Sequence, residues 1–177
     1  MVEEILLKYE KNFDFNPCIL RYFNAAGADP EGETGECHEP EPHILPTLLR
    51  KAMKEETFVI NGDQFNTPDG TCIRDFIHVT DLSEAHILAL KKLIHSRTDH
   101  KVYNLGSGKG YSLLELTKAA GRTLGKNIDW KIGPARPGDA PWAVASSERF
   151  LNEFGWQPKN STLDSMITTA LKWMNKN

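Results

Sequence analysis

Two hydrophobic patterns alternate along the chain: apolar residues at helical spacing, and short apolar runs. Helical spacing over residues 2–13 predicts a first helix, which Pro17 ends before an apolar run over 18–23 that predicts a buried strand. The same patterns predict helices over 44–55, 81–96, 112–125, 147–155 and 161–174, and strands over 57–61, 72–79, 101–105 and 128–132. Because strands alternate with helices, we expect an α/β fold with at least some parallel pairing.

Local signals refine where these elements begin and end. Three predicted helices start with a pair typical of a capping box, a polar residue followed three positions later by an acidic one. These pairs are Asp81 with Glu84, Ser112 with Glu115, and Ser161 with Asp164. A turn is expected over 24–27. The first helix has an apolar stripe but no capping residue before it, so we expect an upstream partner for that stripe and association of the chain if the stripe is exposed.

Composition narrows the class of protein. The chain has 177 residues, of which 40% are hydrophobic and 25% are charged, which is ordinary for one globular domain or a domain with part of another. A net charge of −3 argues against a protein that coats nucleic acid, and no apolar run approaches the ~20 residues of a membrane helix. The start of the chain is acidic, so no secretory signal is expected. Three widely spaced cysteines without a C-x-x-C pair favour a reducing cytoplasm.

One segment differs in charge from the rest. Residues 29–41 contain six acidic residues and neither Lys nor Arg. A solvated acidic loop is favoured over a cation site, because hard-metal loops space their oxygen ligands more regularly. His38 and His43 lie near Cys37 at a spacing that fits zinc poorly, so no zinc site is predicted there.

A glycine-rich loop over 106–111 stands between a predicted strand and a predicted helix. A dinucleotide fingerprint needs a third glycine where Tyr111 stands, and a nucleotide P-loop needs Ser or Thr where Gly110 follows Lys109. Both tests fail, and a tight turn over the end of a sheet is favoured. The chain also lacks the G-x-S-x-G motif of α/β-hydrolases.

Two arginines stand in positions that call for an anion. Arg74 lies inside an apolar strand, where an unpaired guanidinium is costly. Its neighbour Asp75 points to the opposite face of the strand, so that pair cannot close directly. A bound phosphate or a distant carboxylate fits better. Arg136 lies in a loop with Asp139, and two arginines on separate segments could clamp a diphosphate while the acid takes sugar hydroxyls.

Several motifs occur in a fixed order along the chain. They are 20–28 (LRYFNAAGA), 61–63 (NGD), 66–71 (NTPDGT), 74–79 (RDFIHV), 103–106 (YNLG) and 136–139 (RPGD). Together they resemble the UDP-glucose 4-epimerase family of extended short-chain dehydrogenases/reductases. The insert over 67–71 separates this family from related sugar-nucleotide dehydratases, which shorten the loop. The resemblance covers essentially the whole chain.

The resemblance implies binding of NAD by an N-terminal Rossmann domain and of a UDP-sugar by a C-terminal domain. Such enzymes oxidise the sugar C4 hydroxyl, rotate the ketose and return the hydride, which interconverts UDP-glucose and UDP-galactose in galactose metabolism. Their base is the Tyr of a Tyr-x-x-x-Lys pair, whose Lys lowers the phenol pKa. This chain has neither that pair nor the glycine fingerprint. Four positions after its tyrosines stand Phe13, Ala26, Ser107 and Glu115.

The resemblance therefore implies the C-terminal half of such an enzyme. Residues 1–28 would be the terminal part of a Rossmann domain, and 29–177 mainly the UDP-sugar-binding domain, with 72–105 returning to the Rossmann sheet. No catalytic residue and no metal is assigned, and NAD would belong to the intact family rather than to this chain alone.

Individual roles are also implied by the resemblance. Asn24, Arg74 and Arg136 would contact the diphosphate and Asp139 a ribose hydroxyl; His43 and Ile44 would lie over the nucleotide; Val59, Ile60 and Asn61 would offer backbone groups to the uracil; and Phe23 would border the nicotinamide of an intact enzyme. Two positions depart from the family pattern. His43 stands where many members have Asn, and Ala143 where some place a Tyr that contacts sugar.

Three hypotheses remain open from the sequence. The chain is the substrate-binding half of an epimerase, active only if a separate N-terminal half supplies NAD; or a non-catalytic UDP-sugar-binding or interaction module; or a degenerate remnant without ligand. Its expected partners are UDP-glucose or UDP-galactose, a separate N-terminal half or a second copy of the chain, and neither nucleic acid nor membrane.

Overall fold

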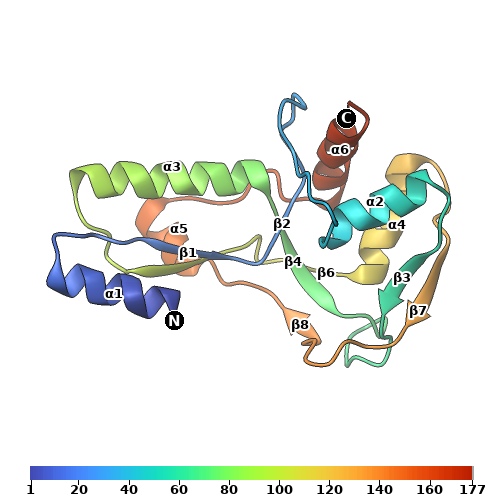
Figure 1. Cartoon of the computed structure of the whole chain (residues 1–177), viewed down its shortest axis with the longest axis horizontal. Helices are drawn as coiled ribbons and strands as arrows, with labels where there is room; N and C mark the ends of the chain where they lie inside the picture. The colour runs from blue at the N-terminus through green and yellow to red at the C-terminus, as the bar shows by residue number, and fades with distance from the viewer. Residues whose placement is uncertain (177) are drawn as a thin grey trace.

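A computed structural model describes residues 1–176 as the expected α/β arrangement of helices and strands (Figure 1). The helices are α1 (Val2–Asn12), α2 (Ile44–Met53), α3 (Val79–His95), α4 (Leu113–Leu124), α5 (Glu148–Phe154) and α6 (Leu163–Met174). The strands are β1 (Ile19–Tyr22), β2 (Asn24–Ala26), β3 (Phe58–Asn61), β4 (Ile73–His78), β5 (Val102–Leu105), β6 (Gly110–Ser112), β7 (Trp130–Gly133) and β8 (Trp142–Ala143).

The strands form three small groups, and most pairs are parallel. Strand β1 pairs with β5, β3 pairs with β7, and β2 and β8 both pair with β4, all in parallel. Strand β6 is the exception, because it runs antiparallel to β4. In Figure 1, β4 runs through the middle of the molecule, between α1, β1, α3 and α5 on one side and α2, α4, β3 and β7 on the other.

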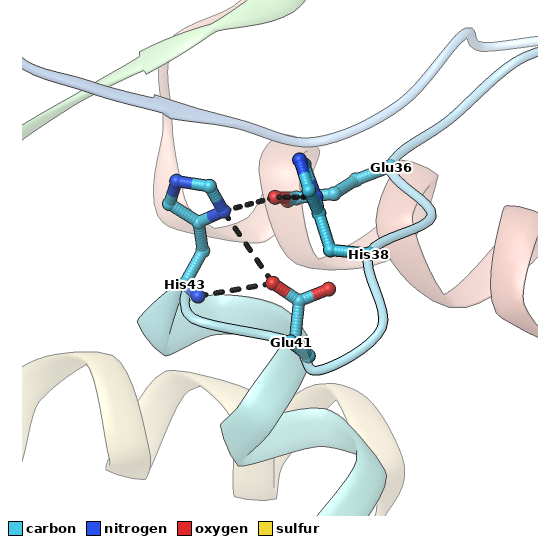
Figure 2. Close-up of side chains that lie close together, drawn as sticks. All are labelled: Glu36, His38, Glu41 and His43. Atoms are coloured by element: carbon cyan, nitrogen blue, oxygen red, sulfur yellow. Dashed lines mark hydrogen bonds and ion pairs between the residues drawn. The ribbon is translucent and has the colours of Figure 1, made fainter.

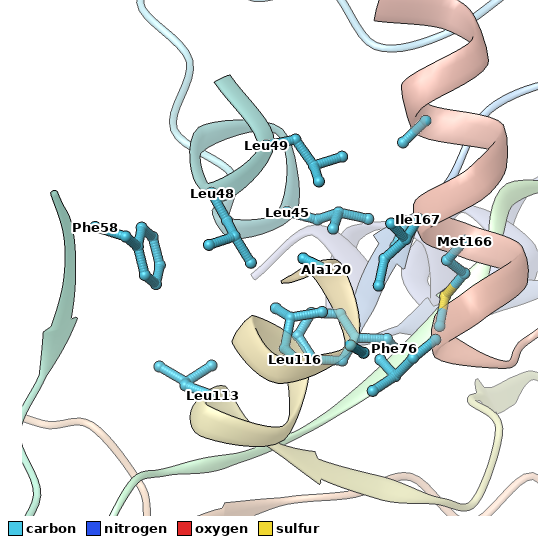
Figure 3. Close-up of a cluster of buried hydrophobic side chains, with 14 of the residues drawn as sticks. Leu45, Leu48, Leu49, Phe58, Phe76, Leu113, Leu116, Ala120, Met166 and Ile167 are labelled. Atoms are coloured by element: carbon cyan, nitrogen blue, oxygen red, sulfur yellow. The ribbon is translucent and has the colours of Figure 1, made fainter. Parts of the chain in front are cut away.

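Two hydrophobic cores lie on the two sides of β4. The larger one joins α2, α4 and α6 with β3 and β4, and Leu48, Leu49 and Leu116 are almost completely buried in it (Figure 3). The smaller one packs α3, α5 and β5 around Tyr103 and Phe150, whose rings meet edge to face at 5.4 Å. Helices α2 to α6 each bury apolar side chains in one of these cores, as their spacing predicts, whereas α1 contributes to neither.

The predicted caps are confirmed at one helix and wrong at two. At α4, Ser112 and Glu115 form the full capping box. At α3 the side chain of His78 caps instead, because Asp81 is fully buried and accepts hydrogen bonds from the 159–161 segment. At α6 the cap is Thr162, since the Ser161 hydroxyl donates to Asp81. The two side chains predicted as caps, Asp81 and Ser161, instead form tertiary hydrogen bonds with each other.

The strand predicted over 18–23 and the turn predicted over 24–27 need correction. Strand β1 ends at Tyr22, and the chain then starts a second strand at Asn24, which pairs with β4. The turn comes one residue later than β2, at Gly27, which has φ +84°. A Cβ at Gly27 would lie 2.8 Å from the ring of His78, so this close approach requires glycine.

Helix α1 carries the exposed apolar stripe that its sequence predicts. All of its residues are at least partly exposed, and Val2, Ile5 and Tyr9 keep 65%, 48% and 54% of their surface. Polar contacts fasten the helix instead, among them a bidentate pair between Arg21 of β1 and Glu3. In the described residues, 1–176, no helix combines the length and apolarity that crossing a membrane requires.

Candidate functional site

The predicted ligand residues converge on one cavity of about 250 Å³. It lies between β2, the start of α2, the strands β3 and β4, and the loop over 133–141. Its walls are formed by Asn24, Pro42, His43, Ile44, Thr47, Phe58, Val59, Asn61, Cys72, Arg74, Leu113, Arg136 and Asp139. Segments that are more than one hundred residues apart in the chain therefore meet here, and eight of the nine substrate residues expected from the sequence line the same space.

Arg74 is the most constrained of these side chains. Only 16% of its side chain is exposed, and its Nη2 lies 3.3 Å from Asp139 Oδ1. Its Nη1 donates to the backbone oxygens of Ile73 and Ala140. Three of the five N–H donors of the guanidinium are thereby engaged. Of the two partners expected for Arg74, a bound phosphate or a distant carboxylate, the structure shows the carboxylate.

Asp75 points to the other face of β4, as strand alternation predicts. The carboxylate is fully buried, and it accepts from the backbone N–H and the hydroxyl of Ser107 at 2.8 and 2.6 Å. It also accepts from the N–H groups of Gly108 and Ala145, both at 3.1 Å. Asp75 thus joins the glycine-rich loop to the segment that follows β8, and fixes one end of the strand that carries Arg74.

The second arginine faces the cavity from the loop after β7. With the Asn61 amide oriented so that its oxygen faces the guanidinium, Arg136 Nε and Nη2 both donate to it at 3.0 Å. On the other wall, Asn24 Nδ2 donates to the backbone oxygen of Asp75 at 2.8 Å, which holds the Asn24 side chain beside β4. Two guanidinium groups and one carboxylate give the cavity a net positive charge, which suits an anionic ligand.

The remaining predicted residues take different places. His43 is the residue before α2, and Ile44 and Val59 line the cavity beside it. Ile60 has no exposed surface and its side chain belongs to the larger core, so only its backbone could serve a ligand. Phe23 faces a second cavity, of about 530 Å³, which it shares with Asn24 and His43.

Cys72 was not predicted from the sequence, although it lines the cavity. Burial raises the pKa of the Cys72 thiol, so the group is a neutral, apolar part of the wall at ordinary pH. The sequence offered a weak signal for it, since Cys72 lies two residues before Arg74 in the strand predicted over 72–79 and would therefore share its face.

The glycine-rich loop over 106–111 does not fit the phosphates of NAD. A dinucleotide phosphate at a glycine-rich loop accepts hydrogen bonds from backbone N–H groups. In the described chain those of Ser107 and Gly108 are directed at Asp75 instead, so the loop already holds an internal anion. The role expected for Phe23 beside a nicotinamide stays a prediction.

The comparisons place this arrangement in a known family. An α/β fold with an arginine-lined cavity is typical of proteins that bind phosphorylated ligands. The chain belongs to the NAD dependent epimerase/dehydratase family, whose model matches residues 1–106. Among proteins of known function it is similar to UDP-glucose 4-epimerases from Lactobacillus helveticus, with 41% identity over 98% of this chain, and from Halalkalibacterium halodurans, with 45% identity over 97% of it.

Solved structures give the same result. A crystal structure of a UDP-glucose 4-epimerase matches with a TM-score of 0.94 and 40% identity, over 99% of this chain and 54% of that one. The Bifidobacterium longum enzyme in complex with NAD⁺ and UDP matches with a TM-score of 0.89 and 36% identity, over 99% and 52%. The chain spans about half the length of the relatives it matches, 52% for both bacterial enzymes named above. The expected resemblance to the C-terminal half of UDP-glucose 4-epimerases is thereby confirmed.

Proposed function

We propose that this chain is the UDP-sugar-binding half of a UDP-glucose 4-epimerase and that its cavity binds the diphosphate of UDP-glucose or UDP-galactose. The observation that carries the proposal is the convergence of Arg74, Arg136 and Asn24 on one cavity from three separate segments. The relative from Bifidobacterium longum, which is similar over the whole of this chain, was solved with UDP.

The geometry explains how a diphosphate would be held. Guanidinium groups donate paired hydrogen bonds to phosphate oxygens. Arg74 is pre-oriented by Asp139 and by two carbonyl oxygens, so it loses little freedom when an anion binds. Arg136 is held only by Asn61 and can exchange that neutral acceptor for a charged one. The carboxylate of Asp139 would accept from a ribose hydroxyl, and backbone groups of Val59, Ile60 and Asn61 would meet the uracil.

The proposal is tested by calorimetric titration of the chain with UDP. Arg136→Gln is the sharper variant, because Arg74 also fastens the 139–140 segment and its loss would disturb the fold. We expect saturable binding that Arg136→Gln weakens by at least about tenfold, the equivalent of one charge-assisted hydrogen bond. The matched control is Arg122→Gln on α4, where the charge is exposed and does not line the cavity. Folded protein that takes up no UDP, or equal affinity in the two variants, would refute the proposal.

Activity would need a second component. The chain lacks a Tyr-x-x-x-Lys pair, and its loop N–H groups are used internally, so the hydride carrier and the base would come from a separate N-terminal half in the cytoplasm. Epimerisation by a mixture of the two halves, and not by either alone, supports this assignment. UDP binding without activity in the mixture would favour a non-catalytic UDP-sugar-binding module, and the absence of both would favour a remnant.

A further inference from the structure

Beside the cavity, the acidic segment over 29–41 and the two residues that follow it bring four potential metal ligands together. Glu36, His38, Glu41 and His43 each offer one ligand atom, and these four atoms lie within 4.8 Å of one another (Figure 2). The sequence predicts no zinc site here, because the spacing of His38 and His43 to Cys37 fits zinc poorly. The two glutamates are not among the ligands that this prediction considers. Cys37 is exposed and is not a member of this cluster.

The distances inside the cluster match the size of a small coordination sphere. His38 Nδ1 lies 3.1 Å from Glu36 Oε1, and His43 Nδ1 lies 3.4 Å from Glu41 Oε1 and also contacts Glu36 Oε1. Ligands about 2.1 Å from a tetrahedral ion are about 3.4 Å from one another. The contacts at 3.1 and 3.4 Å are close to that separation, and all four atoms lie within 4.8 Å of one another.

Glu41 provides a second observation that does not depend on the distances. Only 4% of its side chain is exposed, and in the described part of the chain its Oε2 has no hydrogen-bond partner. The nearest permanent cation is Arg50, whose Nη2 is 3.8 Å from that oxygen and beyond hydrogen-bond distance. The other oxygen, Oε1, accepts from the His43 N–H, so one half of this buried carboxylate is satisfied and the other half is not, which is costly. A cation bound beside this carboxylate would offset part of that cost.

The surroundings favour a cation and hold the ligands in place. Residues 29–41 contribute six carboxylates and neither Lys nor Arg. The backbone of the cluster is fastened at both ends. Trp173 Nε1 donates to the backbone oxygen of Glu36 at 2.9 Å, and the His43 N–H donates to the Glu41 carboxylate at 2.9 Å. Imidazole with carboxylate suits zinc and its neighbours in the first transition series, whereas magnesium and calcium prefer oxygen-only sets.

We propose that Glu36, His38, Glu41 and His43 form a binding site for a divalent transition-metal ion of the Zn²⁺ type. The ion would fix the segment that leads into α2 and forms a wall of the neighbouring cavities. The proposal stands on the cluster alone and does not depend on the binding of UDP.

The test is titration of the full chain, stripped with a chelator and dialysed, with ZnCl₂ and separately with MgCl₂. We expect one saturable Zn²⁺ per chain and no comparable Mg²⁺ binding. CoCl₂ should give the intense visible absorption of a tetrahedral Co²⁺ centre. His38→Ala and Glu36→Gln should each weaken Zn²⁺ binding by at least about tenfold, the loss that even an outer-shell partner causes.

Two control variants separate this site from adventitious binding. His95→Ala removes an exposed histidine of α3, and Cys37→Ser removes the nearby thiol; both should leave Zn²⁺ binding unchanged. His38 is half exposed, so its loss should leave the far-ultraviolet circular dichroism unchanged. Absence of saturable binding, unaltered binding in His38→Ala and Glu36→Gln, or loss of binding in Cys37→Ser would each overturn the proposal and leave a hydrogen-bonded cluster.

Discussion

Asp75→Asn tests how the fold holds the cavity together. Asp75 Oδ1 accepts two hydrogen bonds from Ser107, and Oδ2 accepts one each from Gly108 and Ala145. An asparagine amide keeps one oxygen, so whichever way it turns, its NH₂ group faces two donors. Two hydrogen bonds to a charged acceptor are lost, at about 1.5–3 kcal/mol each, or about 3–6 kcal/mol together. The free energy of unfolding of a domain is only about 5–15 kcal/mol, so the variant should lose a large share of its stability.

The assay is urea unfolding followed by circular dichroism, with the free energy extrapolated to water. Asp63→Asn is the matched control, because it makes the same change of charge at an exposed carboxylate, which accepts a hydrogen bond from the neighbouring Gln64 side chain. If Asp75→Asn does not fold, Ser107→Ala removes a single donor to the carboxylate and should cost about 1–3 kcal/mol. A loss below about 1 kcal/mol in Asp75→Asn would refute the argument that this carboxylate organises the loop.

Two further predictions concern stability and association. Burial lowers the pKa of His78, although the charge of Asp81 opposes this, so the unfolded chain binds the proton more readily than the folded chain. The free energy of unfolding should therefore fall as the pH drops below about 6.5, by up to about 1.4 kcal/mol per pH unit. His78→Gln should reduce that slope in urea unfolding measured between about pH 7 and about pH 5. An equal slope in the two proteins would contradict this. The exposed stripe of α1 should make the chain associate, and Ile5→Ser with Tyr9→Ser should shift its mass in light scattering towards the monomer; a monomeric parent chain would show that the stripe is inert.

Strand alternation explains why part of the site could be predicted without a structure. Because neighbouring strand residues face opposite sides, an arginine in the apolar run over 72–79 could not pair with the acid beside it. That argument needs only the local period, and the structure confirms it at Arg74. The partner itself could not be predicted, since Asp139 is 65 residues away and reaches Arg74 only through the pairing of β8 with β4.

The failures share a physical cause. Ser161 and Asp81 have the residue types of helix caps, yet they bond to each other across 80 residues, because burial makes an unpaired carboxylate far more costly than an unmade cap. Local propensity is worth about 1 kcal/mol at such a position, and tertiary hydrogen bonding overrides it. The residue types therefore predicted correctly that Asp81 and Ser161 form hydrogen bonds, but the predicted partners, the N–H groups at the helix ends, were wrong.

The acidic segment shows the same limit for binding sites. Metal motifs are recognised by spacing when their ligands lie on a helix or a tight turn, where spacing fixes distance. Residues 36–43 lie in a loop whose path is set by contacts to α6 and to the start of α2, so spacing there carries little information. His43 is the point at which this loop meets the cavity. Its ring nitrogen faces the two glutamates, and the same residue lines the cavity. An ion bound by the loop would therefore affect the shape of the cavity wall.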